Sequence, residues 1–307
     1  MFRFLISRLA QAVVVLIVLS AIIFIISRLS GSPVDIMLPQ GATPAQRDAL
    51  IHRLQLDRPA WQQYLAFLKD AVRGDFGVSS RFHTDTLSLV LSRFGNTVLL
   101  ALSAIIIAIV VGVPLGTWAA IRGGRVDSYI STITASAQAM PSFWLAILLI
   151  LVFGVVWRLL PISQFQSWSA LILPAVSLSV LPFVTITRVT RSSILSVVPQ
   201  HYIDTAYAKG LPGRVIVVKH ILRNAMIPIL TVTGLMLGSA LSGAVITETV
   251  FAWPGMGALA VEAIQSRDYS VVQCIAMLAG LVIIVVNLLV DISYRLLDPR
   301  TRIAARE

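Results

Sequence analysis

Six stretches of the chain are apolar and free of charge over lengths that can cross a lipid bilayer, which takes about 20 residues. They cover residues 9–27, 96–121, 129–157, 159–187, 225–247 and 269–290. The third and fourth are longer than one span needs, and their most apolar parts lie near 139–157 and 169–187. The pattern predicts an all-α, polytopic membrane protein with six transmembrane helices.

The charged residues follow this hydrophobic pattern. Only 12% of the residues are charged and the mean hydropathy is +0.87, whereas a soluble domain has about 25% charged residues. If the N-terminus is cytoplasmic, the cytoplasmic segments hold Arg3, Arg8, Arg122, Arg125, Arg188, Arg191, Lys209, Arg214, Lys219, Arg223, Arg295, Arg300, Arg302 and Arg306. The two short outer loops hold one base each, Arg158 and Arg267. By the positive-inside rule, the net charge of +10 indicates cytoplasmic termini rather than binding to nucleic acid.

The first 27 residues begin with basic residues, as a secretory signal does. Their apolar core is too long for a signal, and no small-x-small cleavage site follows it. We therefore expect residues 1–28 to hold the N-terminus and an uncleaved first span. Residues 29–95 then form an extracytoplasmic helical segment, and residues 96–307 form the transmembrane core.

Two short helices are predicted in the extracytoplasmic segment. Thr43 precedes Pro44 and is followed three residues later by Gln46, which is the pattern of a capping box. Asp57 can cap a second helix that ends near Gly74. The apolar stripe of this second helix consists of Trp61, Tyr64, Leu65, Leu68, Ala71 and Val72. These helices either brace the bundle on the outer membrane surface or help to form a docking face.

The chain shows no catalytic or metal-binding pattern. It lacks a phosphate-binding loop, a GxGxxG motif and an HExxH motif, and its four histidines are not at metal-ligand spacing. The single cysteine, Cys274, lies in the sixth span and is interpreted as a small core residue. Few ionisable residues lie near mid-membrane, with Glu248 and Asp291 near span ends, and this disfavours an ion-coupled secondary transporter.

A basic, glycine-punctuated module separates the fourth and fifth spans. Residues 201–224 read HYIDTAYAKGLPGRVIVVKHILRN. A first helix places Tyr202, Ile203, Ala206 and Tyr207 on one face, and Gly210 ends it. A second helix from Arg214 to about 222 leads into the fifth span. The module can lie in a groove of another protein, or lie as an amphipathic linker on anionic lipid.

The spacing of Asp204, Thr205 and Ala206, followed after three residues by Gly210, resembles the EAA---G loop of ABC importer permeases, with Asp in place of Glu. Further motifs in chain order cover nearly the whole sequence. They are LDRPAWQQY (56–64), GDFGVS (74–79), MPSFWLAILL (140–149), ILPAVSL (172–178), RVTRSSIL (188–195), DTAYAKGL (204–211), KHILRNAMIPILT (219–231), GAVITETVFAWPGMG (243–257), RDYSVVQ (267–273) and VNLLVDISYRLLDPR (286–300). Together they resemble the first (B-type) permease subunit of the dipeptide/oligopeptide/nickel class, which is binding-protein-dependent.

This resemblance implies a type I importer permease fold in the bacterial cytoplasmic (inner) membrane. The implied partners are a second homologous permease, two ATP-binding cassette ATPases and an extracytoplasmic substrate-binding protein. ATP and magnesium would bind to the ATPases, so this chain would be no enzyme and would bind no cofactor or metal.

By the same resemblance, residues 199–223 form the ATPase-coupling loop. The residues that would couple the ATPase to the spans are Asp204, Ala206, Gly210 and Arg223. Tyr202 and Tyr207 would serve as packing anchors.

Two points stay open at the level of the sequence. The turn formed by Trp253, Pro254 and Gly255 is either an interfacial tryptophan beside a tight turn or an outer gate or docking element. The expected substrates are di- or oligopeptides, with a nickel, metallophore or glutathione importer as the alternative. The loop at 158–168 is short and lacks an insertion that some dipeptide permeases carry. The resemblance to those permeases therefore does not decide which of these substrates is imported.

Overall fold

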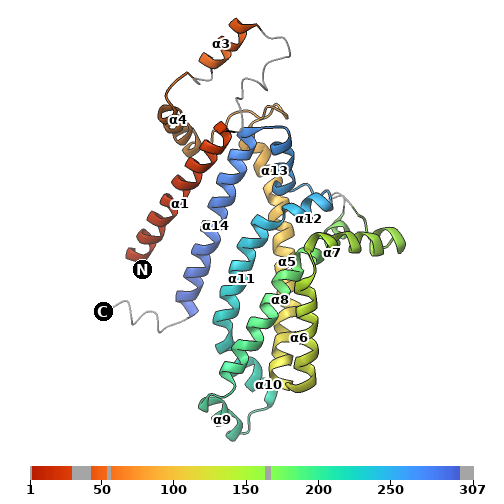
Figure 1. Cartoon of the computed structure of the whole chain (residues 1–307). Coiled ribbons are helices and arrows are strands. Elements are labelled where there is room, and N and C mark those ends of the chain that lie inside the picture. The colour runs from red at the N-terminus through yellow and green to blue at the C-terminus, as the bar shows by residue number, and fades with distance from the viewer. Residues whose placement is uncertain (1, 30–42, 54–56, 163–166, 298–307) are drawn as a thin grey trace. The chain divides into compact units, whose positions relative to one another are not determined.

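The computed structural model describes residues 2–29, 43–53, 57–162 and 167–297 as a helical protein (Figure 1). No strand occurs in these ranges, where only an isolated bridge pairs Val78 with Asp85. The chain forms two compact units. Unit 1 comprises Met1–Asn96 and Pro254–Ile284, and unit 2 comprises Thr97–Trp253 and Val285–Glu307. Two long helices, α5 (Thr86–Arg122) and α14 (Tyr269–Leu297), contribute residues to both units.

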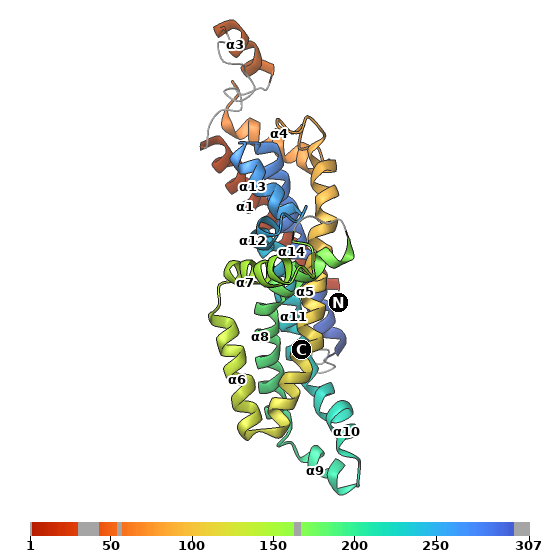
Figure 2. The same ribbon diagram turned by 90° about the vertical axis from the view of Figure 1, so that its right-hand side faces the viewer.

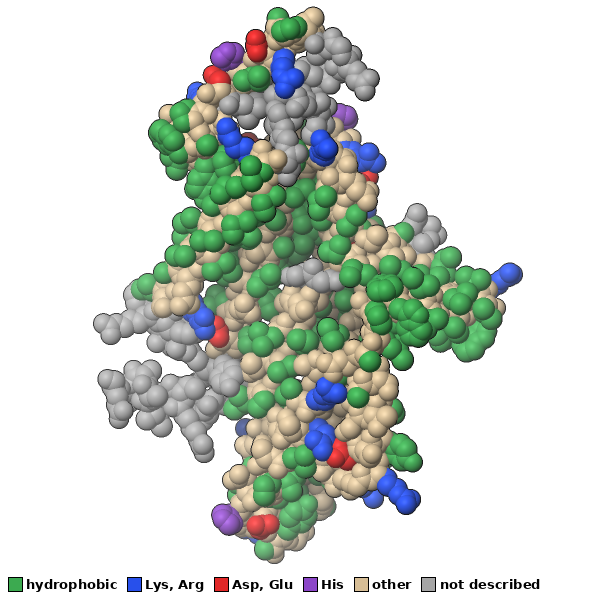
Figure 3. Space-filling view, in the orientation of Figure 1, with side chains coloured by type: hydrophobic (Ala, Val, Ile, Leu, Met, Phe, Trp, Pro, Cys, Tyr) green, Lys and Arg blue, Asp and Glu red, His purple; other side chains and the backbone are tan. Residues whose placement is uncertain are grey.

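The predicted all-α membrane fold is confirmed. Among the described residues, five helices are long and apolar enough to cross a membrane: Ile6–Leu29, Thr86–Arg122, Trp168–Val197, Gly213–Leu241 and Tyr269–Ser293. The pair Gly124–Ala139 and Ser142–Val156 makes a sixth span if it is counted as one, and it bends by 97°. Large apolar side chains are exposed along α1 (Phe2–Leu29), α7 (Ser142–Leu149) and the π-helical η1 (Ile150–Val156) (Figure 3). Exposure of this kind suits lipid contact.

The third apolar run, 129–157, has its most apolar part near 139–157, and in the structure this run is divided between two helices. Helix α6 (Gly124–Ala139) stops, and α7 lies across its direction (Figure 2). The cause is Pro141, whose ring fixes φ at −61° and disfavours a helical conformation for the preceding residue. Met140 is accordingly extended, with φ −81° and ψ 125°.

The helices of the fourth and fifth spans extend beyond the uncharged runs of the sequence. Helix α8 (Ile172–Val197) continues ten residues beyond the expected end at 187, carrying Arg188 and Arg191 within it. The predicted second helix of the 201–224 module, which leads into the fifth span, is confirmed: α10 (Gly213–Val215) and a π-helical segment, η3 (Ile216–Leu222), run into α11 (Arg223–Gly243). The ends of uncharged runs mark where polar residues begin, and a helix can continue past them.

Small residues hold α5 against α8 in unit 2. A Cβ on Gly112 would lie 3.1 Å from the Thr187 hydroxyl oxygen, and one on Gly116 would lie 2.4 Å from the Thr187 carbonyl oxygen. Glycines four residues apart let membrane helices approach closely. Helix α6 is tied to α8 by the bidentate ion pair of Asp127 with Arg191.

In unit 1, α4 (Ala60–Val72) packs on α1. The Tyr64 hydroxyl lies 2.9 Å from the Ser20 hydroxyl, and the Tyr64 ring lies 5.5 Å from that of Phe24. Of the predicted apolar stripe, Trp61, Leu65 and Val72 are instead exposed. The partly buried side of α4 therefore covers only part of that stripe.

The predicted capping box begins α3 (Pro44–Arg53) as expected. The Thr43 amide donates to the Gln46 side chain at 2.9 Å, and the Gln46 amide lies 3.4 Å from the Thr43 hydroxyl. The predicted Asp57 cap of α4 is wrong. Pro59 occupies the cap position without a side-chain hydrogen bond, and the Asp57 carboxylate contacts His52 at 3.0 Å.

A buried carboxylate joins two distant motifs of unit 1. Asp268, 1% exposed, accepts a hydrogen bond of 2.5 Å from the Ser79 hydroxyl. The other Asp268 oxygen lies 3.4 Å from the Val271 amide in the first turn of α14. Arg81 then pairs with Glu262 of α13 (Met256–Gln265) at 2.9 Å. These contacts fix the 74–85 loop against the start of α14.

Candidate coupling surface

A short helix, α9 (His201–Ala208), follows α8 at one end of unit 2 (Figure 1). Gly210 ends it with a φ of +73°, in the left-handed region that favours glycine. The Gly210 amide donates to the Tyr207 carbonyl at 2.9 Å, and the Leu211 amide donates to the Ala206 carbonyl at 3.4 Å. These two bonds form a Schellman motif, and Pro212 follows it. The predicted helix and its glycine stop are confirmed.

The inner side of α9 is built into the helices that follow and precede it. Ile203 and Ala206 are 1% and 5% exposed. They belong to one buried cluster, which we call the α9 root, with Ile194, Ile216, Ile221, Ala225 and Ile229. The α9 root therefore joins α9 to α8, η3 and α11 through contacts between side chains. Ala206, expected in coupling, lies on this inner side.

The two tyrosines border the buried side of α9. At 100° per residue, Tyr202 and Tyr207 fall on either side of Ile203 and Ala206. They are 42% and 56% exposed, so the four residues share one broad face of which only the middle is covered by this chain. The Tyr202 hydroxyl accepts a 3.0 Å hydrogen bond from Asn224 of α11. Asn224 was not singled out from the sequence, because its partner lies 22 residues away.

The charged residues expected in coupling lie on the outside of the module. Asp204 is exposed in the first turn of α9, where a negative charge is favoured by the helix dipole. Arg223 is exposed at the first residue of α11. Between them runs η3, and π-helical turns within α-helices are frequent at functional sites. The module thus presents Tyr202, Asp204, Tyr207 and Arg223 at its surface, and buries Ala206.

The turn at 253–255 is arranged differently from an exposed docking element. Trp253 is 1% exposed and packs with Leu100, Ala175 and Ala244 in unit 2. The boundary between the two units falls after it, so Pro254 and Gly255 belong to unit 1, where the Pro254 carbonyl accepts from Asn96 at 2.9 Å. The buried indole does not fit an interfacial tryptophan.

Glu248 occupies a buried, hydrogen-bonded position that the sequence did not suggest. It lies in α12 (Val245–Val250), is 0% exposed, and accepts a 2.7 Å hydrogen bond from the Thr97 hydroxyl of α5. From the sequence it was expected only near a span end. A single acidic residue in an otherwise uncharged stretch was the available signal.

In the described ranges, no group of three or more His, Cys, Asp or Glu residues is placed to hold a metal ion. What the fold does offer is a set of bilayer-spanning helices with a helix–turn–helix at one end, rooted in the bundle and exposed on its outer side. This arrangement is typical of the membrane subunit of a transport complex, which works through contacts with partners.

The comparisons with known proteins agree with this class and make it specific. Residues 112–303 match the family described as "Binding-protein-dependent transport system inner membrane component", and residues 1–101 match its N-terminal companion family. The chain belongs to this family. It is a multi-pass inner-membrane permease subunit of an ABC importer and not an enzyme, and the family implies ATPase and substrate-binding partners.

Several curated relatives share the whole length of the chain. The dipeptide transport system permease protein DppB of Escherichia coli K12 is 36% identical, over 98% of this chain and 99% of the relative. The oligopeptide permease AppB of Bacillus subtilis 168 is 34% identical over 98% and 99%, and the glutathione permease GsiC of E. coli O1:K1 is 35% identical over the same shares. A chain of the inward-facing MetNI methionine ABC transporter shares the fold, with a TM-score of 0.56 and 17% identity over 69% of this chain and 97% of that one.

Replacing Gly210 tests how the module is built. Because a β-branched residue is strained in the left-handed region, Gly210→Val should cost about 1–2 kcal/mol locally. No atom lies within 4 Å of a Cβ at this position, so the cost is conformational and not steric. We expect normal membrane insertion and reduced substrate-stimulated ATP hydrolysis in the assembled complex.

Two matched variants complete this experiment. Gly213→Ala lies three residues away, also with open space around its Cβ but without the left-handed φ, and should behave as wild type. Gly210→Asn should retain most coupling, because asparagine tolerates this conformation. Unchanged substrate-stimulated hydrolysis in Gly210→Val would contradict the assignment.

Proposed function

We propose that this chain pairs with a second homologous permease around a shared path, above two ATPases, and imports peptides delivered by an extracytoplasmic binding protein. The observation that carries the proposal is the α9 root. It connects the exposed helix α9 to α8 and α11, so that a movement of α9 is transmitted to these spans. Membership of the permease family supports it.

In the proposed mechanism, residues 199–223 couple ATP hydrolysis to transport. Helix α9 lies in a cleft of one ATPase, with Tyr202 and Tyr207 in contact with it and Asp204 and Arg223 at the rim. Closure of the ATPases on ATP moves α9 and the helices rooted to it. ATP and substrate thereby favour different arrangements of one two-state system. ATP and magnesium bind to the ATPases, while this chain supplies no covalent chemistry.

The proposed topology has both termini in the cytoplasm. It counts α6 with α7 and η1 as one span, so that six spans place α9 in the cytoplasm and residues 29–95 outside. The division of basic residues supports it, although Arg300, Arg302 and Arg306 lie outside the described residues. On this view residues 1–28 form the first span, and residues 96–307 form the permease core. Pro254 and Gly255 lie on the outer side, where we propose that the turn supports a gate.

Cysteine labelling tests the topology. In a Cys274→Ala background, an impermeant maleimide added to intact spheroplasts should label Arg47→Cys, which is exposed on α3. Gly213→Cys should be labelled only after the membrane is opened. Labelling of position 213 in intact spheroplasts would overturn the arrangement.

The peptide assignment rests on the relatives, several of which are named as dipeptide, di/tripeptide or oligopeptide permeases. One relative is named for glutathione, itself a small peptide-like solute, and this keeps a glutathione importer as the second candidate. A nickel or metallophore importer remains the third candidate, from the class that the sequence motifs resemble. Selectivity is proposed to reside mainly in the binding protein.

Transport by the reconstituted complex tests the function. Proteoliposomes holding both permeases and both ATPases, with the binding protein outside and ATP inside, should accumulate labelled di- or oligopeptides. Omitting either ATP or the binding protein should abolish accumulation. Uptake driven by an ion gradient alone would indicate a secondary transporter. Accumulation of glutathione or nickel without any peptide uptake would replace the peptide assignment.

A further inference from the structure

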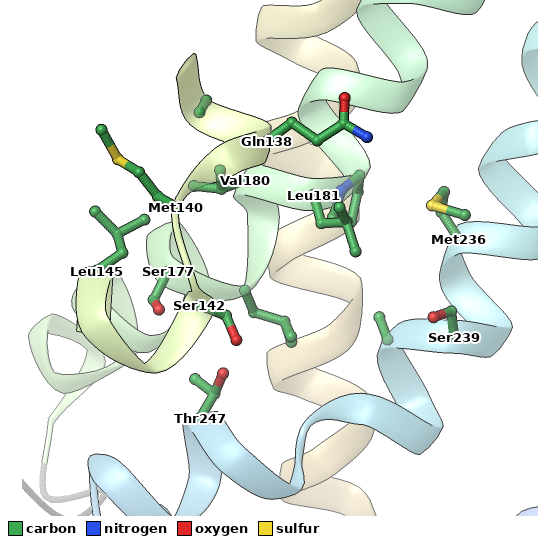
Figure 4. Close-up of a pocket in the computed structure, with 14 residues that line it drawn as sticks. Gln138, Met140, Ser142, Leu145, Ser177, Val180, Leu181, Met236, Ser239 and Thr247 are labelled. Atoms are coloured by element: carbon green, nitrogen blue, oxygen red, sulfur yellow. The ribbon is translucent and has the colours of Figure 1, made fainter. Parts of the chain in front are cut away.

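A cavity of about 230 Å³ opens at the surface of unit 2, where several helices break or bend (Figure 4). Its walls come from the end of α6, the start of α7, the middle of α8 around Pro182, the end of α11 and α12. A single water needs only about 10–15 Å³, so the cavity holds more than isolated waters. It is a place where the bundle leaves room that its own side chains do not fill.

The lining is uncharged and mostly apolar, with a few polar side chains among the apolar ones. Among the described residues that form it, none is Asp, Glu, Lys, Arg or His. The polar groups are the Gln138 amide and the hydroxyls of Ser142, Ser177, Ser239 and Thr247. Figure 4 shows Ser142 and Thr247 close together on one side and Ser239 on α11 opposite. Hydroxyl and amide groups both donate and accept hydrogen bonds, as a peptide bond does.

Ser177 is the residue that points to a ligand. It is 2% exposed, and its hydroxyl has no hydrogen-bond partner among the described residues. Ser179 on the same helix is 4% exposed, but it donates to the Val176 carbonyl at 2.8 Å and does not line the cavity. Buried polar groups are nearly always paired, so an unpaired one in a cavity wall needs an explanation. The cavity that Ser177 lines is the adjacent space from which a ligand can supply that partner.

We infer that this cavity is a subsite of the import path that holds an uncharged peptide-bond segment of the cargo, with the Ser177 hydroxyl hydrogen-bonded to the amide. This inference rests on the proposed function. Neutral hydroxyl groups bind an amide weakly, and weak binding suits a path that must release its cargo. The flexible thioether of Met236 beside them adapts to side chains of different shape.

Substitution of Ser177 tests the subsite. In the full complex in proteoliposomes, Ser177→Ala should lower the peptide uptake rate about 2–10-fold, the loss expected for one hydrogen bond. ATP hydrolysis without substrate should stay at the wild-type rate. Ser179→Ala, which removes a hydroxyl already paired within α8, should leave uptake unchanged. A purely structural Ser177 predicts instead that removing an unpaired buried hydroxyl leaves uptake as it was.

A second measurement reports occupancy without relying on rate. Ser239 is exposed on the cavity wall, so Ser239→Cys in a Cys274→Ala background gives a single reactive thiol. During turnover with peptide-loaded binding protein, peptide should slow the modification of this thiol by a small methanethiosulfonate. Unloaded binding protein with ATP should give no protection.

The outcomes separate this inference from the proposed function. If the wild-type complex imports no peptide, the proposed function fails and the subsite fails with it. If the wild type imports peptide, while Ser177→Ala transports normally and Ser239→Cys is not protected, only the subsite is wrong. Reduced uptake in Ser177→Ala together with peptide protection of Ser239→Cys confirms the subsite.

Discussion

The packing of Ile203 and Ala206 against α8, η3 and α11 is the interaction on which the proposed coupling depends. A helix of eight residues has little stability of its own, because too few hydrogen bonds offset the ordering of its backbone. The α9 root supplies that stability, and it also connects α9 mechanically to the spans. Burying the middle of one face leaves the remaining surface, with Asp204 and the two tyrosines, for a partner.

Close packing and polar links also hold the other helices of unit 2 together. Helices within a bilayer gain little from the hydrophobic effect, so close backbone approach and polar links hold them together. Gly116 against Thr187, Asp127 with Arg191, and Thr97 with Glu248 are links of these kinds. Glu248 is a fully buried carboxylate that accepts a hydrogen bond from a neighbouring helix. Buried ionisable residues in membrane helices mark functional sites by default, and here the bond joins α5 to α12, beside the wall of the proposed subsite.

Much of the fold could be predicted from the sequence, and the exceptions share a cause. The spans, the Thr43 capping box and the Gly210 stop depend on residues close together in the chain, and each was visible. The size of the bend at Pro141, 97°, could not be predicted, because a proline in an apolar span indicates a kink but not how far the helix turns. Asp57 was assigned a cap that the structure does not contain.

The site was only partly predictable for the same reason. The resemblance to the EAA---G loop located α9, while helical spacing alone could not tell which part of its apolar face the chain covers itself. That depends on Ile194 and Ala225, which reach the face from two other helices. The bond of Ser79 to Asp268 spans 189 positions, and the unpaired Ser177 hydroxyl is defined by what surrounds it. Such features need three-dimensional neighbours that no local pattern encodes.

The most direct test of the central claim is whether α9 moves as one body with the helices to which it is rooted. Spin labels at Asp204 on α9 and at Val218 on η3, both exposed, allow the distance between them to be measured by pulsed electron resonance in the assembled transporter. The account predicts the same distance distribution without nucleotide and with ATP trapped in the ATPases. A distinct ATP-dependent shift would show α9 swinging free of the spans, and would contradict coupling through the α9 root.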